Sequence, residues 1–410
     1  MNISLLKKWF RELETVGADP GGGVTRLAYS PEEDAMFLKI AGFAAEMGLN
    51  VSEDCIGNMY ISFPGREGTP CHGIGSHLDS VPQGGLYDGP AGVLAGLLVM
   101  EEIRSSGLDL PVMTAVFRAE ESSLYGLATA GSGVAAGSVD IAQLKNALSI
   151  SGDSLYDAMS SKGYSPGVCG LEKMLDFTEL HIEQGRVLWE SGLHIGIVTA
   201  IAAPTRLKVT IHGRQDHSGA TPMDLRKDGL CAAADIILAV ESAGNAEKHH
   251  ATVATVGVAN VRPNALNVVP GLVELRIDIR GILKDSISRT VKAVKDSVRA
   301  ASDTRGILCD VETISSMDPV SLDPSVIRSL SRAAEELSVP FRQMASGAGH
   351  DTMKIAPLVP AGMVFIPCKE GISHNQQEEA DLEDIALGAR VILDGIRLRR
   401  SNNTSDDCSK

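Results

Sequence analysis

The 410-residue sequence predicts an α/β protein in which a mixed-sheet domain is interrupted by a smaller α+β domain. Two observations predict this arrangement. Short β-rich runs alternate with helical stretches through the first half and again after Asp318, whereas from about Thr205 the order is β-α-β-β-α-β. Because such a split βαβ unit closes its own four-stranded sheet, we expect one discontinuous domain of residues 1–204 and 319–410 around an inserted domain of residues 205–318.

In the first domain, apolar runs bounded by turn residues mark the elements. Strands are expected at NMYISFPG, HGIGSHLDSV and PVMTAVFRAEE, with a helix through AGVLAGLLVMEEIRSSG between the second and the third. Beyond Asp318 we expect a helix from Ser325 to Leu337, strands at FRQMAS and GMVFIP, and a last helix from Asp381 to Arg397. The polar tail SNNTSDDCSK has no periodic apolar pattern and is expected to be frayed.

The inserted domain is assigned from the same kinds of pattern. The expected order is a strand at RLKVTIHGR, a helix after Met223, strands at TVATVGVANV and LVELRIDIRG, a helix through SISRTVKAVKDSVRAA and a strand at LCDVETIS. We expect the two helices to cover one face of the four-stranded sheet.

Composition narrows the class of protein. The net charge of −15, without a run of Lys or Arg, argues against a nucleic-acid or anionic-membrane partner and favours a small-molecule substrate. No segment approaches the roughly 20 consecutive apolar residues of a membrane span, and the start lacks a signal-peptide pattern, so we expect a cytoplasmic protein. The seven cysteines are scattered without CxxC spacing, which predicts reduced thiols rather than disulfides or a zinc cluster.

The segment GSHLDSVPQGGLYDG places His77, Asp79 and Asp88 where an apolar strand gives way to a glycine-rich helix start. Side chains repeat every two residues in a strand, so His77 and Asp79 would point the same way. His77 could then bind a metal while Asp79 orients its imidazole. Alternatively, the two aspartates are ordinary turn formers beside Pro82 and the glycines.

Further candidate ligands follow the other strands. In FRAEES, the repulsion between Glu120 and Glu121 is offset if one carboxylate binds a cation and the other holds an attacking water as general base. The alternative is an exposed acidic loop or the first turn of a helix. His181 in TELHIEQG and His374 in GISHN would singly be ordinary strand or surface histidines. Together these residues supply enough nitrogen and oxygen ligands for a pair of divalent metals.

The segments GSHLDS, GGLYDG, AEES, ELHIEQG and GISHN, in this order, resemble the two-metal aminoacylase and carboxypeptidase superfamily. With GGVTRLAYS, HSGATPM, NALNVVPG followed by DIR, and SGAGHD, they are similar to its N-carbamoyl-L-amino acid hydrolases, allantoate amidohydrolases and β-ureidopropionases. The resemblance covers nearly the whole chain. It implies a catalytic domain of the zinc-aminopeptidase type with an inserted ferredoxin-like domain for dimerisation and substrate clamping.

The resemblance also implies roles for the candidate ligands. His77 and His181 would bind one metal, Glu121 and His374 the other, and Asp88 would bridge the two, with Glu120 as general base and Asp79 in support. Two divalent ions are implied, zinc by default, with manganese, cobalt or nickel as alternatives because all accept such ligands. A non-proline cis peptide is implied between Asp88 and Gly89.

The substrate residues, too, are implied by the resemblance and not by spacing. They are Gln184, His217, Asn267, Arg280 and Gly349, with His350 in a supporting role. Arg280 could hold a substrate carboxylate, Asn267 and Gln184 could bind ureido or amide groups, and His217 could stabilise the developing oxyanion. A homodimer through the inserted domain is implied, in which a histidine such as His217 can reach the partner's site.

The function implied is hydrolysis of the carbamoyl (ureido) C–N bond of an N-carbamoyl-L-amino acid or a related ureido acid. The alternatives are an allantoate amidohydrolase or β-ureidopropionase, a dipeptidase or aminoacylase with the same metals, and a non-catalytic binding protein. Retention of Glu120 and of every ligand argues against the last. One departure from the family is Leu124, where an arginine is usual, and it bears on substrate preference rather than on hydrolysis.

Overall fold

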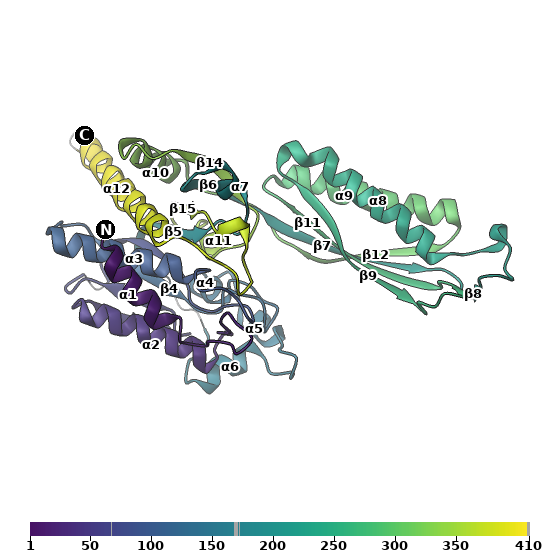
Figure 1. Cartoon of the computed structure of the whole chain (residues 1–410), viewed down its shortest axis with the longest axis horizontal. Coiled ribbons are helices and arrows are strands. Elements are labelled where there is room, and N and C mark those ends of the chain that lie inside the picture. Colours follow the sequence, from purple (N-terminus) through teal and green to yellow (C-terminus); the bar gives the residue numbers. More distant parts are fainter. Residues whose placement is uncertain (67, 168–170, 172, 408–410) are drawn as a thin grey trace. The chain divides into compact units, whose positions relative to one another are not determined.

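The structure, a computed structural model, describes residues 1–66, 68–167, 171 and 173–407. The chain forms two compact units (Figure 1). The first unit comprises residues 1–199 and 322–410, and the second comprises residues 200–321. The mixed α/β architecture expected from the sequence is confirmed.

The first unit is built on a nine-stranded mixed sheet. The strand order is β1-β2-β4-β3-β5-β15-β6-β13, with β14 paired to β6; β13 and the last two residues of β6 fall within residues 200–321, where the chain passes between the units, but pair in this sheet. Its strands are β1 (Asn50–Glu53), β2 (Met59–Ser62), β3 (Cys71–His77), β4 (Val112–Phe117), β5 (Met174–Ile182), β6 (Ile195–Ile201), β13 (Val320–Ser321), β14 (Phe341–Ser346) and β15 (Ala361–Ile366).

Four neighbouring strands in the middle of this sheet run parallel. β3 pairs in parallel with both β4 and β5, and β5 pairs in parallel with β15. Their carboxyl ends therefore meet at one edge of the sheet, where ligand sites of α/β proteins lie. This arrangement brings together chain segments that are up to about 290 residues apart in sequence.

Helices cover the sheet. The α-helices of the first unit are α1 (Ile3–Leu13), α2 (Pro31–Glu46), α3 (Pro90–Ser106), α4 (Ala130–Ala135), α5 (Ile141–Asn146), α6 (Leu155–Ser161), α7 (Val187–Ser191), α10 (Pro324–Glu336), α11 (Thr352–Ile355) and α12 (Leu382–Asp407), with the 3₁₀ turn η3 (Lys369–Gly371). The largest core joins α1, α2, α3, α10 and α12 to one face of the sheet. Alternation along β4 explains the two faces, because Val112 and Val116 enter this core whereas Met113 and Phe117 enter a smaller one.

Local signals explain where the principal helices begin and end. The Ser30 side chain accepts a hydrogen bond from the Glu33 backbone N–H at the start of α2, and Pro31 takes the first helical position. Pro90 also opens α3, which ends at Gly107 in the left-handed conformation. Helix α3 is buried along most of its length and directly follows the loop that carries Asp88.

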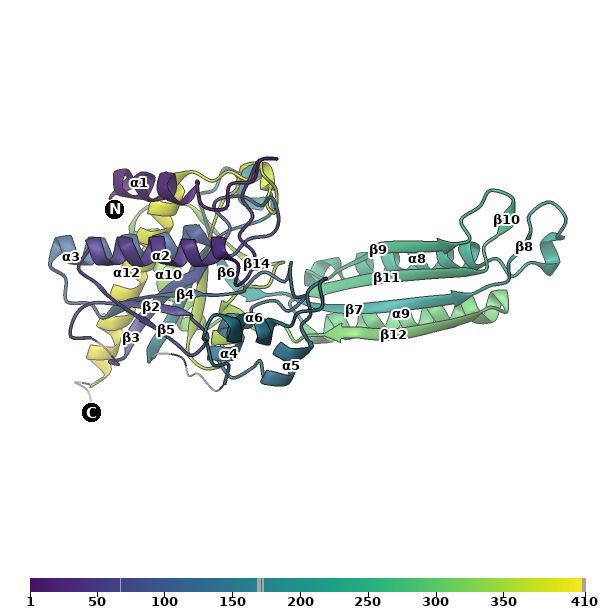
Figure 2. The ribbon, with the colours of Figure 1, turned by 90° about the horizontal axis from the view of Figure 1, so that it is seen from below.

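The second unit is a four-stranded antiparallel sheet in the order β12-β7-β11-β9, with α8 and α9 packed on one face (Figure 2). Its elements are β7 (Ala203–His212), β8 (Asp216–His217), η1 (Met223–Leu225), α8 (Gly229–Glu247), η2 (Lys248–His250), β9 (Val253–Arg262), β10 (Val268–Val269), β11 (Leu272–Gly281), α9 (Lys284–Arg305) and β12 (Leu308–Ser316). Strands β8 and β10 form a small separate sheet that the sequence did not predict.

Helix α8 is the one helix of the described residues that meets the length and composition of a membrane span. The stretch Gly229–His250 has a mean hydropathy of 1.2. Its Ala233, Ile236 and Val240 are buried in the core of the second unit, so its apolar character is explained by packing on the sheet.

Two expectations about the chain are wrong in part. Helix α12 runs through Asp407, so residues 401–407 of the polar tail are helical rather than frayed, and Cys408 to Lys410 lie outside the described residues. Cys55 is disulfide-bonded, whereas Cys71, Cys231, Cys309 and Cys368 are free thiols and Cys169 lies outside the described residues. Sequence spacing cannot show which cysteines a fold brings within bonding distance.

Candidate metal centre

Asp88 is the centre of the candidate site. Its carboxylate belongs to two groups of potential metal ligands, one with His77 and His181 and the other with Glu121 and His374. The ligand atoms within each group lie within 4.8 Å of one another. These five residues come from the carboxyl ends of β3, β4, β5 and β15 or from the loops that follow them. The structure thus brings together the five residues that the sequence suggested as metal ligands.

The first group places acceptor atoms against each other. His181 Nε2 lies 3.1 Å from Asp88 Oδ1, and His77 Nε2 lies 3.6 Å from the same oxygen. His181 Nδ1 is 2.9 Å from the Ile182 carbonyl, which makes Nδ1 the protonated nitrogen and leaves the Nε2 lone pair facing Asp88. His181 Nε2 is buried and has no hydrogen-bond partner. Two facing acceptors require a cation or a proton between them, so this donor set fits a divalent metal.

The second group repeats this arrangement on the other carboxylate oxygen. His374 Nε2 lies 3.4 Å from Asp88 Oδ2 and 3.2 Å from Glu121 Oε1. The Gln184 amide donates to Asp88 Oδ2 at 2.7 Å, while its own Oε1 is buried without a partner. His374 is 48% exposed, whereas His77 and His181 are almost fully buried. The second group is therefore the side of the site that is open to solvent.

Charges within the cluster raise the pKa of its histidines. Burial lowers the pKa of His181, but the Asp88 carboxylate outweighs burial and raises it. Hydrogen bonds to Asp88 and then to Glu121 raise the pKa of His374 to about 10. Burial opposes the charged form of Asp88, yet its histidine neighbours hold the pKa of that carboxyl well below its usual range. The space between these groups favours positive charge, which a metal ion supplies.

Asp79 organises the adjacent carboxylates Glu120 and Glu121. Its Oδ1 accepts the backbone N–H of Glu120 at 3.0 Å, and its Oδ2 accepts that of Glu121 at 2.9 Å. The His77 Nδ1 is closer to the Asp79 carbonyl, at 3.1 Å, than to the carboxylate, at 3.5 Å. Asp79 thus contacts His77 chiefly through its backbone, and its fully buried side chain fixes the Glu120–Glu121 turn.

Glu120 is 7% exposed and lies beside the ligand groups without belonging to either. Burial raises the pKa of Glu120 well above its ordinary value, and Glu121 and Asp351 add to the effect while His77 opposes it. A buried carboxylate beside a cation site is placed to accept and return a proton.

The expectation of a cis peptide bond between Asp88 and Gly89 is wrong. Among the described residues the only cis bond is Arg262-Pro263. The turn is made instead by Gly89, whose φ is 84°. A Cβ at Gly89 would lie 2.6 Å from the His77 ring and 2.7 Å from its carbonyl oxygen, so only glycine fits this position.

In a third group of potential ligands, Glu179, His181 and His350, the Glu179 and His350 side chains have hydrogen-bond partners outside the group. Glu179 accepts hydrogen bonds from the Ser76 hydroxyl at 2.8 Å and from the Thr352 hydroxyl at 2.6 Å. The His350 ring packs edge-on against His181 with 4.5 Å between centroids, and burial followed by the nearby His181 lowers its pKa. His350 therefore lies against a ligand as a neutral ring. Gly349 immediately precedes it, in the turn that follows β14.

The three residues expected from the inserted domain fall into two places. His217 in β8 pairs with Val268 in β10, and the Asn267 carbonyl accepts the Ser218 N–H at 3.1 Å, so His217 and Asn267 are neighbours. Arg280 lies at the opposite end of β11, paired with Pro204, where its Nε donates to Asp278 at 2.8 Å. Figure 2 shows β8 and β10 beyond one end of the four-stranded sheet.

Sequence reasoning missed two residues that contact the Asp88 loop. Glu378 accepts the backbone N–H of Tyr87 at 2.9 Å and that of Asp88 at 3.0 Å. The Ser373 hydroxyl lies 2.9 Å from Asp88 Oδ2. The available signal was their position beside His374 in GISHNQQEE, which places a hydroxyl and a carboxylate within four residues of a candidate ligand.

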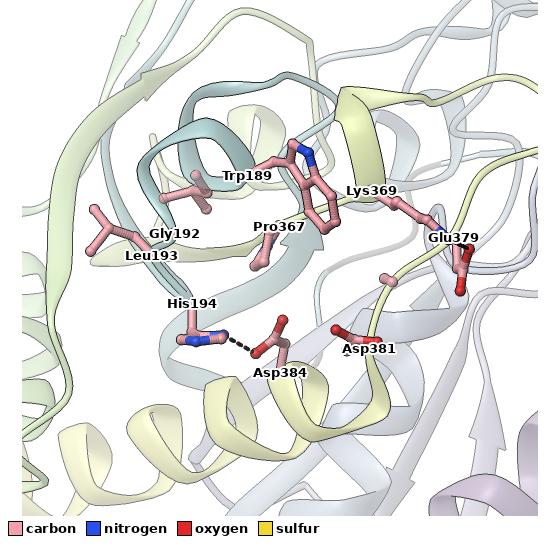
Figure 3. A pocket seen from close by; sticks show the side chains of 11 residues that line it. Trp189, Gly192, Leu193, His194, Pro367, Lys369, Glu379, Asp381 and Asp384 are labelled. Carbon is pink, nitrogen blue, oxygen red and sulfur yellow. Dashed lines mark hydrogen bonds and ion pairs between the residues drawn. The ribbon is translucent and has the colours of Figure 1, made fainter.

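A separate cavity of about 310 Å³ lies beside α7, η3 and the start of α12 (Figure 3). Its wall includes Trp189, Pro367, Lys369 and Glu379, and Asp384 accepts a hydrogen bond from His194 at 2.7 Å. None of the five candidate ligands lines this cavity, so it is distinct from the metal centre.

The sequence profile of peptidase family M20/M25/M40 matches residues 73–397, which span the candidate ligands from His77 to His374. The chain belongs to this family. Members of the family depend on metal, usually two divalent ions, in keeping with the two groups that share Asp88.

Relatives of this M20-family chain carry ureido-hydrolase names. The N-carbamoyl-L-amino acid amidohydrolase of Geobacillus stearothermophilus is 38% identical over 394 residues, covering 93% of this chain and 94% of that protein. The allantoate amidohydrolase of Escherichia coli (strain K12) is 35% identical over 388 residues, with the same coverage of 93% and 94%. An amidase of the hydantoinase/carbamoylase family from Burkholderia multivorans superposes with a TM-score of 0.89 at 34% identity, covering 96% of this chain and 97% of that one. The resemblance seen in the sequence is confirmed.

Asp79→Asn tests the contact that holds the two glutamates. The amide nitrogen that replaces one carboxylate oxygen cannot accept a backbone N–H, so one buried donor loses its partner. We expect a loss of stability of about 1–3 kcal/mol in urea denaturation and faster hydrogen exchange at the Glu120 or Glu121 amide. Asp310→Asn, at an exposed pair with His212, is the control and should change neither. Unaltered exchange at both glutamate amides would contradict this role of Asp79.

Proposed function

We propose that this M20-family chain is a metal-dependent amidohydrolase that cleaves the ureido C–N bond of an N-carbamoyl-L-amino acid or a closely related ureido acid. The observation that carries the proposal is the Asp88 carboxylate, which faces His77 and His181 with one oxygen and His374 and Glu121 with the other. We assign the five residues as ligands of two divalent ions, with zinc as the default and manganese, cobalt or nickel as alternatives.

When bound, the metal ions supply Lewis-acid polarisation of the scissile carbonyl and lower the pKa of the attacking water. The residues of the chain handle the proton. Glu120, held by Asp79 through its backbone, takes a proton from the water and returns it to the leaving nitrogen, as a buried carboxylate beside the ligand groups is placed to do. For a carbamoyl group the products are ammonia, carbon dioxide and the free amino acid.

Polar groups beside the ligands support a ureido substrate. The Gln184 Oε1 is a buried acceptor without a partner, a position suited to receive a ureido or amide N–H. Arg280 offers a planar guanidinium for a substrate carboxylate, and Asn267 can both donate to and accept from a ureido group. Gly349 allows the backbone to approach the substrate, and His217 donates a hydrogen bond to the developing oxyanion. Allantoate and 3-ureidopropionate fit the same groups, and dipeptides or N-acyl amino acids are the further alternative.

We propose that the functional protein is a homodimer. Leu272 and Arg280 are eight residues apart on β11, which corresponds to roughly 26 Å at about 3.3 Å per residue, and His217 and Asn267 lie beyond the Leu272 end. One small substrate cannot contact Arg280 and His217 of the same subunit. If both contact the substrate, as we propose, at least one of them serves the site of a second copy of the chain, and the inserted unit is then both a dimerisation and a clamping element.

Ammonia release by the metal-loaded protein tests the reaction. We expect release from one member of a panel of N-carbamoyl-L-amino acids, 3-ureidopropionate and allantoate, and none from dipeptides. Glu120→Gln should lower kcat by at least about 100-fold because the general base is lost, without a change in metal content. If only dipeptides or N-acyl amino acids were cleaved, the ureido assignment would fail and the metal centre would remain.

Arg280→Met tests recognition of the substrate carboxylate. We expect kcat/KM to fall by about 10- to 100-fold, since a charge-assisted hydrogen bond to the substrate is lost. Arg276→Met is the matched control, because Arg276 lies on the same strand and pairs with Glu274 two residues earlier, as Arg280 pairs with Asp278. Equal effects of the two changes would contradict the assignment of Arg280.

Mixed dimers test whether His217 acts in the partner's site. A heterodimer of one Glu120→Gln subunit and one His217→Ala subunit can be isolated with two different tags. If His217 acts across the interface, one of its two sites is intact and about half of the wild-type activity per dimer is expected. If His217 acts in its own subunit, neither site is intact and the heterodimer should be as inactive as its parents.

A further inference from the structure

Glu378 holds the backbone of the loop that carries Asp88. Its Oε1 accepts two consecutive N–H groups, that of Tyr87 at 2.9 Å and that of Asp88 at 3.0 Å. The Glu378 residue is 6% exposed, so water does not replace these bonds readily. The loop also closes tightly on this side chain, because a Cβ at Gly85 would lie 2.2 Å from Glu378 Oε1.

The second oxygen of Glu378 faces the segment that carries His374. The Ser373 hydroxyl lies 3.3 Å from Glu378 Oε2 and 2.9 Å from Asp88 Oδ2. Glu378 and Ser373 therefore connect the His374 segment to both the backbone and the carboxylate of Asp88. None of these contacts involves β3 or β5, which hold His77 and His181.

A carboxylate that serves two ligand groups has a stricter geometric requirement than one that serves a single group. Asp88 must present Oδ1 to His77 and His181 while Oδ2 stays near His374 and Glu121. Rotation of the Asp88 side chain or a shift of its backbone improves one set of distances at the expense of the other. The backbone N–H groups of the loop must therefore be fixed by something outside both ligand groups.

We propose that Glu378 is a positioning residue that fixes Asp88 between the two ligand groups, acting from the segment that also supplies His374. The inference rests on the proposed function only for the assignment of the five ligands. Glu378 touches neither substrate nor metal. Its loss weakens metal loading, above all in the group of Asp88, Glu121 and His374, because two of these three ligands depend on the segment 373–378.

Glu378→Gln is the first variant to test, with Glu379→Gln as its control. The glutamine retains an oxygen that can accept the two N–H groups and an NH2 group that can donate to the Ser373 oxygen, so the fold is retained. A neutral amide oxygen accepts the two backbone N–H groups more weakly than a carboxylate oxygen does, so the hold on the Asp88 loop is weakened. Glu379 is the adjacent residue, is exposed and pairs with Lys369 at the wall of the cavity in Figure 3. Both changes replace a carboxyl group by an amide at neighbouring positions of the chain.

The primary measurement is the number of zinc ions per chain after equilibrium dialysis against a graded series of buffered zinc concentrations. We expect the loading midpoint of one of two ions to shift by about 10- to 100-fold in Glu378→Gln and to stay unchanged in Glu379→Gln. Thermal unfolding of the metal-free proteins should be similar for both variants. Excess zinc should restore kcat in Glu378→Gln with little change in KM, which a general loss of structure would not produce.

Ser373→Ala provides a second, independent variant. Removal of the hydroxyl should shift the same loading midpoint in the same direction and by less, because the Glu378 carboxylate still accepts the two backbone N–H groups at full strength. Wild-type loading curves for both Glu378→Gln and Ser373→Ala would overturn the inference. A wild-type protein that binds two zinc ions but cleaves no ureido compound would overturn the proposed function alone, since the loading comparison would still decide the role of Glu378.

Discussion

The sharing of one carboxylate by two sets of ligands is the constraint on which the rest of the first unit depends. Asp88 faces the ring nitrogens of two histidines with one oxygen and that of a third histidine with the other, and only Gln184, through its amide N–H, is a donor to it in this set. Facing acceptors of this kind repel unless a cation lies between them, so the protein must hold them together by other means. The buried helix α3, the glycine at position 89 and the carboxylate of Glu378 all act on the short loop that carries Asp88.

Parallel pairing of β4, β3, β5 and β15 explains how distant segments supply one centre. Each strand ends at the same edge of the sheet and delivers one part of the site. The strands alone do not fix the side chains, however. The side chains are fixed by buried carboxylates that accept backbone N–H groups. Asp79 holds the turn of Glu120 and Glu121 in this way. Glu378 holds the turn that carries Asp88. Such bonds are costly to lose in a buried site, so they hold the backbone of both turns in place.

The sequence predicted those features that depend on local pattern. Apolar runs located β3, β4 and β15, and the polar residues that follow them were recognisable as candidates because parallel strands end together. Features that depend on contacts between distant segments were not predictable in this way. Three such features depend on which residues meet in space. They are the disulfide of Cys55, the contacts of Glu378, and the hydrogen bonds of the Asp79 carboxylate to backbone N–H groups rather than to the His77 ring. The cis peptide was implied by family resemblance and not by any residue pattern, and the positive φ of Gly89 makes the turn without it.

The length of β11 limits how the residues of the inserted unit can take part in the proposed chemistry. A shorter sheet would allow Arg280 and His217 to converge on one substrate within a subunit, whereas ten-residue strands keep them at opposite ends. If both contact the substrate, then the site is complete only where two chains meet, and association becomes a condition for catalysis rather than a source of stability alone. Residues at the β8–β10 end would then be under constraint from a substrate bound to another subunit. Such a constraint would account for two polar side chains that stand together here, His217 in β8 and Asn267 immediately before β10.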